Sequence, residues 1–297
     1  MKQDFELRKL RDFGQVFNDT FVFFKDNLKP LLRSLFVICG VLMLIGIVST
    51  VATYLNVSSI LNFKPDPNTY GVDRFNAAFF INLIITVFSL LITQACISLV
   101  TLCYMSVYLQ NNNQEPTVTQ VWGYFKYYFW RVLGASILTS ILAIIGVFFC
   151  ILPGIYLGIV FSLVIPIIVM ENASFGYAFN KSFTLIRDNW WFVFGVLVVI
   201  GIIVYIANRI AAVPLSLTTV SSGFLTNKSI LVPVMIFFAI LQNMLLITHS
   251  LSSIAISLCY FDLVEQKEGT GLIGRIDNFG KAEPTEDAPG LEPAEEY

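Results

Sequence analysis

Five stretches without a single Asp, Glu, Lys or Arg constrain the fold of this chain most strongly. They cover residues 34–55, 75–114, 132–170, 189–208 and 229–261. A helix needs about 20 consecutive apolar residues to cross the hydrocarbon core of a bilayer. The run 132–170 is long enough for two crossings, and Pro153-Gly154 near its middle predicts a tight turn between them. Charged residues make up only 13% of the chain, whereas soluble domains contain about 25%.

The sequence therefore predicts an all-α integral membrane protein with six transmembrane helices. The expected spans cover residues 31–55, 75–108, 132–150, 154–170, 190–212 and 230–261. They form a transmembrane domain over 31–263, preceded by an N-terminal amphipathic interfacial helix within 1–30. The tail 264–297 has nine acidic and three basic residues, and we expect this acidic cytoplasmic tail to be largely disordered.

Amphipathic segments precede the first, third and fifth spans. In the first, apolar residues three or four positions apart mark one helix face: Leu10, Phe13, Phe17, Phe21, Phe24 and Leu28. Arg11, Asp19, Lys25 and Asp26 fall on the other side. Such helices are expected to lie in the head-group plane of the membrane. Thr117 and Gln120 have capping-box spacing, which predicts the start of the second segment, and Ser174 is the expected cap of the third.

An internal repeat relates these segments. Phe17–Phe21 matches Phe179–Phe183, and Lys25-Asp26-Asn27 matches Arg187-Asp188-Asn189, both at an offset of 162 residues. The middle segment matches only in pattern. We therefore expect three transmembrane hairpins, each preceded by a cytoplasmic interfacial amphipathic helix.

The distribution of basic residues predicts the orientation. If the N-terminus is inside, the inner segments hold 14 of the 18 Lys and Arg residues. Basic residues accumulate on the cytoplasmic side of membrane proteins, so both termini are expected in the cytoplasm. Residues 1–33 show no cleavable signal peptide, and the first span is expected to direct insertion.

One central stretch carries a family resemblance. It contains Leu152-Pro153-Gly154-Ile155-Tyr156, followed by Pro166, Glu171, Ala178, Ser182-Phe183, Leu185 and Trp190. This pattern resembles a group of bacterial inner-membrane proteins that includes the membrane domain preceding some glycerophosphodiester phosphodiesterases. The resemblance extends over most of 10–262. It implies a six-helix membrane domain without an established activity of its own, and we expect the soluble phosphodiesterase domain to be absent.

Four polar residues within spans 2 and 6 are candidates for a polar path or ligand site: Gln94, Gln242, Asn243 and His249. Ionisable groups within membrane spans often mark substrate paths. The competing interpretation is structural, because interhelical hydrogen bonds between such side chains also stabilise membrane bundles. His249 is the only histidine, and no second metal-ligand pattern accompanies it, so we expect neither a metal nor a cofactor.

Other residues point to membrane anchoring and helix packing. The expected interfacial anchors are Glu171, Lys181, Arg187, Trp190 and Trp191, with Lys181, Arg187 or Arg131 as a partner for Glu171. Gly154, Gly158 and Ser162 are spaced by four residues, which indicates a small-residue face where two helices approach closely.

These features favour a non-enzymatic inner-membrane protein of bacteria that interacts with membrane lipids or serves envelope homeostasis. The alternative is a transporter or permease subunit with a polar path between spans 2 and 6. A third possibility is a scaffold that binds other membrane proteins through its C-terminal tail, where Leu272–Ile276 is an expected docking motif. Neither a zinc-protease motif nor a phosphate-binding loop occurs, and nothing indicates nucleic-acid binding. The sequence leaves the oligomeric state open.

Overall fold

The computed structural model describes residues 6–61, 77–111, 113–149, 151–221 and 228–269. Within these ranges all regular elements are helical. In chain order they are α1 (Phe13–Asp26), α2 (Leu28–Leu61), α3 (Ala77–Gln110), α4 (Val118–Phe149), α5 (Ile151–Ser162), α6 (Val164–Glu171), α7 (Phe175–Ile186), α8 (Trp190–Ser221), α9 (Lys228–Leu245), the 3₁₀ turn η1 (Leu246–Thr248) and α10 (His249–Glu268).

The described helices provide six candidate membrane spans by length and composition, which confirms the predicted number. They are Leu28–Val57, Phe79–Gln110, Val118–Phe148, Ile151–Glu171, Trp190–Thr218 and Val232–Glu268. The chain is therefore a multi-pass membrane protein.

The helix boundaries differ from the predicted ones in four places. Residues 118–131, expected as a separate interfacial helix, are the first part of α4, because no helix-breaking residue separates them from the apolar run. Helix α4 ends at Phe149 and α5 begins at Ile151, so the chain changes helix before Pro153 rather than at it. The fourth span is divided at Leu163, three residues before Pro166, a proline that cannot supply the backbone N–H of a continuous helix.

The fourth difference lies in the last span. It consists of α9 and α10 joined by the 3₁₀ turn η1, so His249 is the first residue of α10. A 3₁₀ turn within a long helix marks a local departure from regular α geometry. The position of His249 is thus a helix junction rather than the middle of an unbroken helix.

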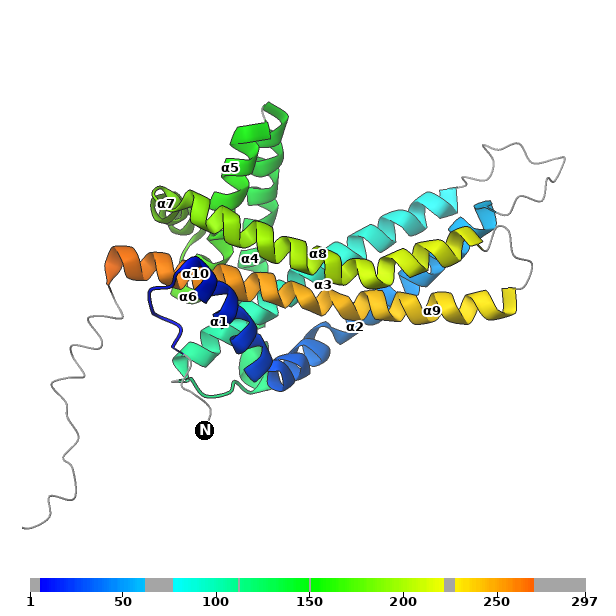
Figure 1. The fold of residues 1–297 in the computed structure, drawn as a ribbon, viewed down its shortest axis with the longest axis horizontal. Helices are drawn as coiled ribbons and strands as arrows, with labels where there is room; N and C mark the ends of the chain where they lie inside the picture. Colours follow the sequence, from blue (N-terminus) through cyan, green and yellow to red (C-terminus); the bar gives the residue numbers. More distant parts are fainter. Residues whose placement is uncertain (1–5, 62–76, 112, 150, 222–227, 270–297) are drawn as a thin grey trace, which may run out of the picture.

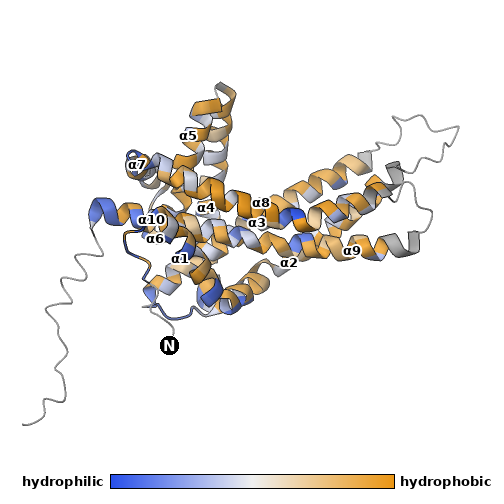
Figure 2. Cartoon of the chain, in the orientation of Figure 1, coloured by the Kyte–Doolittle hydropathy of each residue, from blue (hydrophilic) through white to orange (hydrophobic). Residues whose placement is uncertain are grey.

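Figure 1 shows two groups of long helices that diverge from a common end of the molecule. Helices α2, α3, α8 and α9 run together, with α2 packed on α3, α8 on α9, and α2 on α9. The pair α4–α5 projects in a different direction. Helices α1, α6, α7 and α10 lie at the common end, which we call the junction end; Figure 2 shows hydrophilic residues gathered there on α1 and on the far part of α10.

Helix α10 is the centre of the junction end. From Ser253 to Val264 every residue is buried, and α10 contacts α1, α3, α6, α7 and α8. The main hydrophobic core surrounds it and includes the fully buried Ile97, Tyr104, Ile167 and Leu258. Because α10 touches so many elements, it fixes the short helices α1 and α7 relative to the spans.

Side-chain caps define the starts of the three amphipathic segments. The predicted capping box before α4 is confirmed: Thr117 N–H donates to Gln120 Oε1 at 2.9 Å, and Gln120 N–H donates to Thr117 Oγ1 at 3.4 Å. The predicted Ser174 cap of α7 is confirmed by a 3.5 Å bond from Tyr177 N–H. Helix α1 has a further capping box between Asp12 and Gln15, which was not predicted from the sequence.

Candidate functional site

The four polar candidates of spans 2 and 6 lie in different environments. Gln94 is exposed on α3, Gln242 and His249 are half-buried, and Asn243 is fully buried. Within the described part of the chain, no hydrogen bond joins Gln94 to the other three. The structure therefore places Gln94 on the outer surface of the four-helix group, apart from Asn243.

Asn243 is packed into a helix contact. Its Nδ2 donates to Ala239 O at 2.9 Å and to Thr50 Oγ1 of α2 at 3.4 Å. Its Oδ1 faces Gly46, where a Cβ atom would lie only 2.7 Å away. A Cβ atom at position 46 would force the Asn243 side chain to shift, so the close contact between α2 and α9 leaves Asn243 no space for a ligand on that side.

Several interhelical hydrogen bonds that were not predicted from the sequence hold the same four-helix group together and join it to η1 and the start of α10. Thr53 and Thr86 hydroxyls are 2.7 Å apart across α2 and α3. Thr101 of α3 donates to Ser250 at 3.1 Å. Asn208 of α8 donates to Thr248 at 3.1 Å, next to His249. Bonds of this kind stabilise membrane helices by roughly 0.6–2 kcal/mol each, which makes this part of the bundle a structural unit.

Close packing through small residues occurs in the α4–α5 pair. A Cβ atom on Gly154 would lie 2.4 Å from the Val147 side chain, and one on Gly146 would lie 3.3 Å from Gly154 Cα. Gly158 faces open space, and Ser162 Oγ donates to Ile159 O of its own helix at 2.6 Å. Of the three predicted packing residues, Gly154 is the one at the close contact, and its partner Gly146 was missed.

The anchor residues Glu171 and Lys181 form an ion pair at the junction end. Lys181 Nζ lies 2.8 Å from Glu171 Oε1 and 2.7 Å from Glu268 Oε1. Tyr260 OH of α10 donates to the same Glu171 oxygen at 2.5 Å. Burial alone would lower the pKa of Lys181, but the two carboxylates outweigh it and raise the pKa above its ordinary value. This cluster, which we call the Lys181 cluster, joins α6, α7 and α10.

The other predicted anchors contribute differently. Arg131 donates to Asn172 Oδ1 at 2.8 Å rather than pairing with Glu171, and Arg187 is exposed. Trp190 stacks on Phe194 with ring centroids 5.0 Å apart, and its Nε1 is buried without a described partner. Trp191 has 77% of its surface exposed.

A second buried ion pair holds α1. Arg11 Nε donates to Asp19 Oδ2 at 2.8 Å, and the Arg11 side chain is fully buried. The backbone N–H of Arg11 donates to Asp262 Oδ1 of α10, also at 2.8 Å. Burial raises the pKa of Asp19, but hydrogen bonds from Lys9 and Arg11 outweigh it and hold that pKa below its ordinary value. We call these residues the Arg11 cluster.

The Arg11 cluster corrects the expected orientation of α1. Arg11 and Asp19 were assigned to the solvent side, yet both are buried, together with Val16, Thr20 and Phe23. Phe13 and Phe21 of the predicted apolar face are more than 40% exposed. The spacing of apolar residues distinguished two faces of α1. It did not show that the face containing Asp19 packs against the protein, which leaves Phe13 and Phe21 exposed.

Aromatic and basic side chains are exposed together around the junction end. The aromatic members are Phe13, Phe21, Trp122, Tyr127, Trp130, Tyr177 and Trp191. Three cations lie over their rings: Lys126 at 5.1 Å from the Trp122 centroid, Arg131 at 5.7 Å from Tyr127, and Lys181 at 5.7 Å from Tyr177. We call this set the aromatic–basic belt, and its composition is typical of a membrane–water interface.

Comparison with known protein families gives one match. Residues 132–279 match the family model described as the membrane domain of glycerophosphoryl diester phosphodiesterase. This part of the chain is therefore similar to that membrane domain. The predicted resemblance is thus confirmed, although the match starts at 132 whereas the resemblance was expected over most of 10–262. Comparisons with curated proteins and with solved structures gave no match.

The part that matches this membrane-domain family includes both the close α4–α5 contact at Gly154 and the whole Lys181 cluster. The Arg11 cluster lies before it, except for Asp262. Among the described residues, no group of three or more His, Cys, Asp or Glu side chains is placed to hold a metal ion.

Proposed function

We propose that this chain is a non-enzymatic protein of the bacterial inner membrane that acts on the lipids around it and thereby serves envelope homeostasis. In this proposal the junction end faces the cytoplasm, and both termini lie on that side. The excess of basic residues in the inner segments supports this orientation. The lack of zinc-protease and phosphate-loop motifs in the sequence supports a non-enzymatic role.

The proposed architecture is a threefold repeat of an interfacial segment and a transmembrane hairpin. The contacts of α2 with α3, α4 with α5, and α8 with α9 support the hairpins. Helices α1 and α7 precede α2 and α8 as separate short helices, whereas the second segment is continuous with α4. All three segments meet the junction end, where they would lie against the same membrane leaflet.

The aromatic–basic belt is the observation that carries the proposed function. Indole and phenol rings concentrate at the interface, and each basic residue near an anionic surface adds about 1 kcal/mol of attraction. Because Lys126 and Arg131 are exposed and lie over exposed rings, the belt presents charge and aromatic surface together. Lys181 contributes its contact with Tyr177, while its charge is paired with Glu171 and Glu268. Such a surface fits the anionic head groups of the cytoplasmic leaflet.

Transport through a path between spans 2 and 6 is less well supported. It requires Gln94, Gln242, Asn243 and His249 to line one cavity, but Gln94 is exposed and Asn243 is packed against Gly46 and Thr50. The proposed tail motif Leu272–Ile276 lies outside the described residues. Binding of other membrane proteins through the tail is therefore supported by the sequence alone.

The proposal is tested by extracting the protein from bacterial membranes in copolymer discs and comparing the co-extracted lipid with the bulk lipid. Wild type is expected to carry a higher share of anionic phospholipid. The variant Trp122→Leu with Lys126→Gln should reduce that enrichment. The matched control is Tyr205→Leu with Arg209→Gln, which removes a similar cation–ring pair (4.6 Å) far along α8. Bulk lipid composition around wild type would contradict the proposal.

A further inference from the structure

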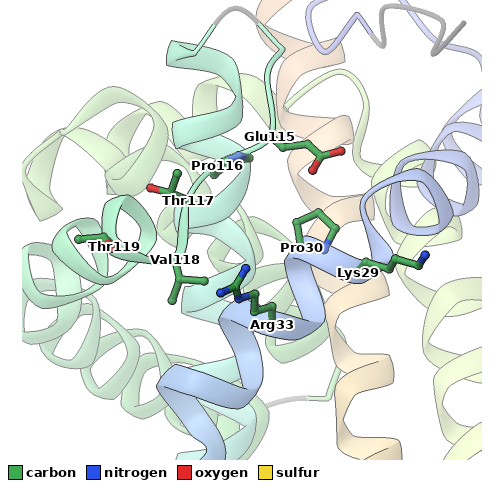
Figure 3. A pocket seen from close by; sticks show the side chains of 8 residues that line it. All are labelled: Lys29, Pro30, Arg33, Glu115, Pro116, Thr117, Val118 and Thr119. Carbon is green, nitrogen blue, oxygen red and sulfur yellow. The ribbon is translucent and has the colours of Figure 1, made fainter.

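A cavity lies between the start of α2 and the start of α4, the first helices of the two diverging groups. It has a volume of about 600 Å³ and is lined by Lys29, Pro30 and Arg33 of α2 and by residues 115–119 around the start of α4. Figure 3 shows Arg33 extending toward Val118 from one side, with Pro30 and Glu115 on the other. Lys29 lies at the rim and extends away from Arg33.

The polar groups of this cavity suit a phosphate. Arg33 and Lys29 are exposed, and within the described chain neither has an ion-pair partner. The Thr117 side chain caps Gln120, while the N–H groups of Val118 and Thr119 have no intrahelical partner because they belong to the first turn of α4. A guanidinium group opposite the N–H groups of a helix start provides charge and directional donors for phosphate oxygens.

The charge of the lining favours a singly charged group. Two cations line the cavity, and the Glu115 carboxylate, which takes part in a further interaction, lies in the same lining and disfavours a second negative charge on the bound group. A phosphodiester carries a single negative charge, whereas a phosphomonoester carries between one and a half and two negative charges at neutral pH. The lining therefore complements a phosphodiester better than a free or terminal phosphate.

An apolar stripe continues from Arg33 into the membrane span. Val37, Val41, Leu44 and Val48 follow Arg33 at steps of three and four residues, so they share its helix face. Their exposed fractions lie between 63% and 70%. A lipid whose head group occupied the cavity would find a continuous path for an acyl chain along α2, which a soluble phosphate ester would not use.

We propose that this cavity is a discrete binding site for an anionic phospholipid. Arg33 and the first-turn N–H groups of α4 hold its phosphodiester, Lys29 adds positive charge at the rim, and an acyl chain follows Val37, Val41 and Leu44. The lipid then bridges α2 and α4 at the point where the two helix groups diverge. This inference rests on the proposed contact with anionic lipid and adds to it a site of defined stoichiometry.

Native mass spectrometry of the whole chain, with phosphatidylglycerol titrated into delipidated protein in mild detergent, tests the site. Wild type is expected to retain one phosphatidylglycerol molecule more tightly than further copies. The variant Lys29→Gln with Arg33→Gln should weaken that first binding step by about tenfold or more, because charge-assisted bonds are lost. The control variant Lys25→Gln with Arg187→Gln removes the same charge at two exposed positions outside both the cavity and the belt, and should leave the first step unchanged.

The outcomes separate this site from the broader proposal. Equal weakening in both variants would overturn the site and leave only diffuse attraction of lipid to basic residues. No retained lipid in wild type would contradict the site, while the copolymer-disc comparison would still decide the proposed function independently. Inorganic phosphate is the competing probe: displacement of the lipid by millimolar phosphate would assign the cavity to a free anion and overturn the lipid. Circular dichroism of each variant verifies that the helices are intact.

Discussion

Helices α1 and α7 contain the same sequence pattern 162 residues apart, and they differ at the charged position inside it. Asp19 of α1 corresponds to Lys181 of α7. Asp19 pairs with the cations Arg11 and Lys9, whereas Lys181 pairs with the carboxylates Glu171 and Glu268.

The next position shows what the two helices share. Thr20 and Ser182 are both fully buried, and each hydroxyl donates to a carbonyl of its own helix, at 2.6 Å and 2.7 Å respectively. Both ion clusters also reach α10, through Asp262 in one case and through Tyr260 and Glu268 in the other. The repeat thus preserves how the helix docks on the junction end, while the sign of the charge depends only on the neighbours.

The largest loss of stability is expected when Arg11 is removed. Arg11→Ala removes the fully buried cation beside Asp19 and leaves only Lys9, whose side chain is 36% exposed, as its partner. A buried pair that loses one partner costs about 3–5 kcal/mol, and because Lys9 remains we expect a loss near the lower end, about 3 kcal/mol. We expect a large fall in the thermal midpoint in detergent, followed by nanoscale differential scanning fluorimetry. Arg11→Lys should recover part of the loss. An unchanged midpoint for Arg11→Ala would show that α1 docks without this pair.

The matching change in α7 should have a smaller effect. Lys181→Met removes the cation from Glu171 and Glu268, but the Glu268 side chain is 42% exposed and water replaces part of the lost interaction. We expect a loss of about 1–2 kcal/mol, measured in the same assay. A loss as large as that of Arg11→Ala would contradict the difference in burial between the two clusters.

The stability contributed by the two ion clusters should also depend on pH in opposite ways. The pKa of Asp19 is lowered from 3.8, so its contribution to stability is present above that value and is lost as pH falls through the folded-state pKa. The pKa of Lys181 is raised from 10.5, so its contribution is present below that value and is lost as pH rises through the folded-state pKa.

Stability measured against pH checks this contrast. Asp19→Asn should flatten the acid limb relative to wild type and leave the alkaline limb unchanged, whereas Lys181→Met should flatten the alkaline limb. If both variants altered the same limb, the assignment of opposite roles would be wrong.

The smallest effect is expected at the shared hydroxyl position. Exchanging the residues, as Thr20→Ser in one variant and Ser182→Thr in another, retains both hydrogen bonds and changes one methyl group. Each variant should stay within about 1.5 kcal/mol of wild type in urea or thermal unfolding. A much larger loss for Ser182→Thr would mean that the two docking sites differ in shape as well as in charge.

The sequence predicted the large features of the fold because each depends on composition over many residues. Runs without charge, such as 132–170, identified the spans, and Thr117 and Ser174 located two helix starts. The sequence could not distinguish a helix face that contacts lipid from one that contacts protein, because apolar residues recur every three or four positions on both. The burial of Asp19 was missed for this reason.

Contacts between residues far apart in the chain could not be predicted from the sequence either. The Glu171–Lys181 pair was among the expected alternatives, but Tyr260 and Glu268 come from a distant segment and nothing local indicates them. The break at Thr248 before His249 has no proline or glycine that would reveal it. The separation of Gln94 from Asn243 likewise depends on the rotation of α3 about its axis.

The four tryptophans allow a direct test of the central claim that the junction end lies at the membrane–water interface. Trp122, Trp130, Trp190 and Trp191 all belong to this end, so the intrinsic fluorescence of the unmodified protein reports its depth. The measurement is quenching in vesicles whose phospholipids carry bromine either near the head group or near the chain end. Stronger quenching by shallow bromine is the predicted result. Stronger quenching by deep bromine, or no quenching at either depth, would contradict the account.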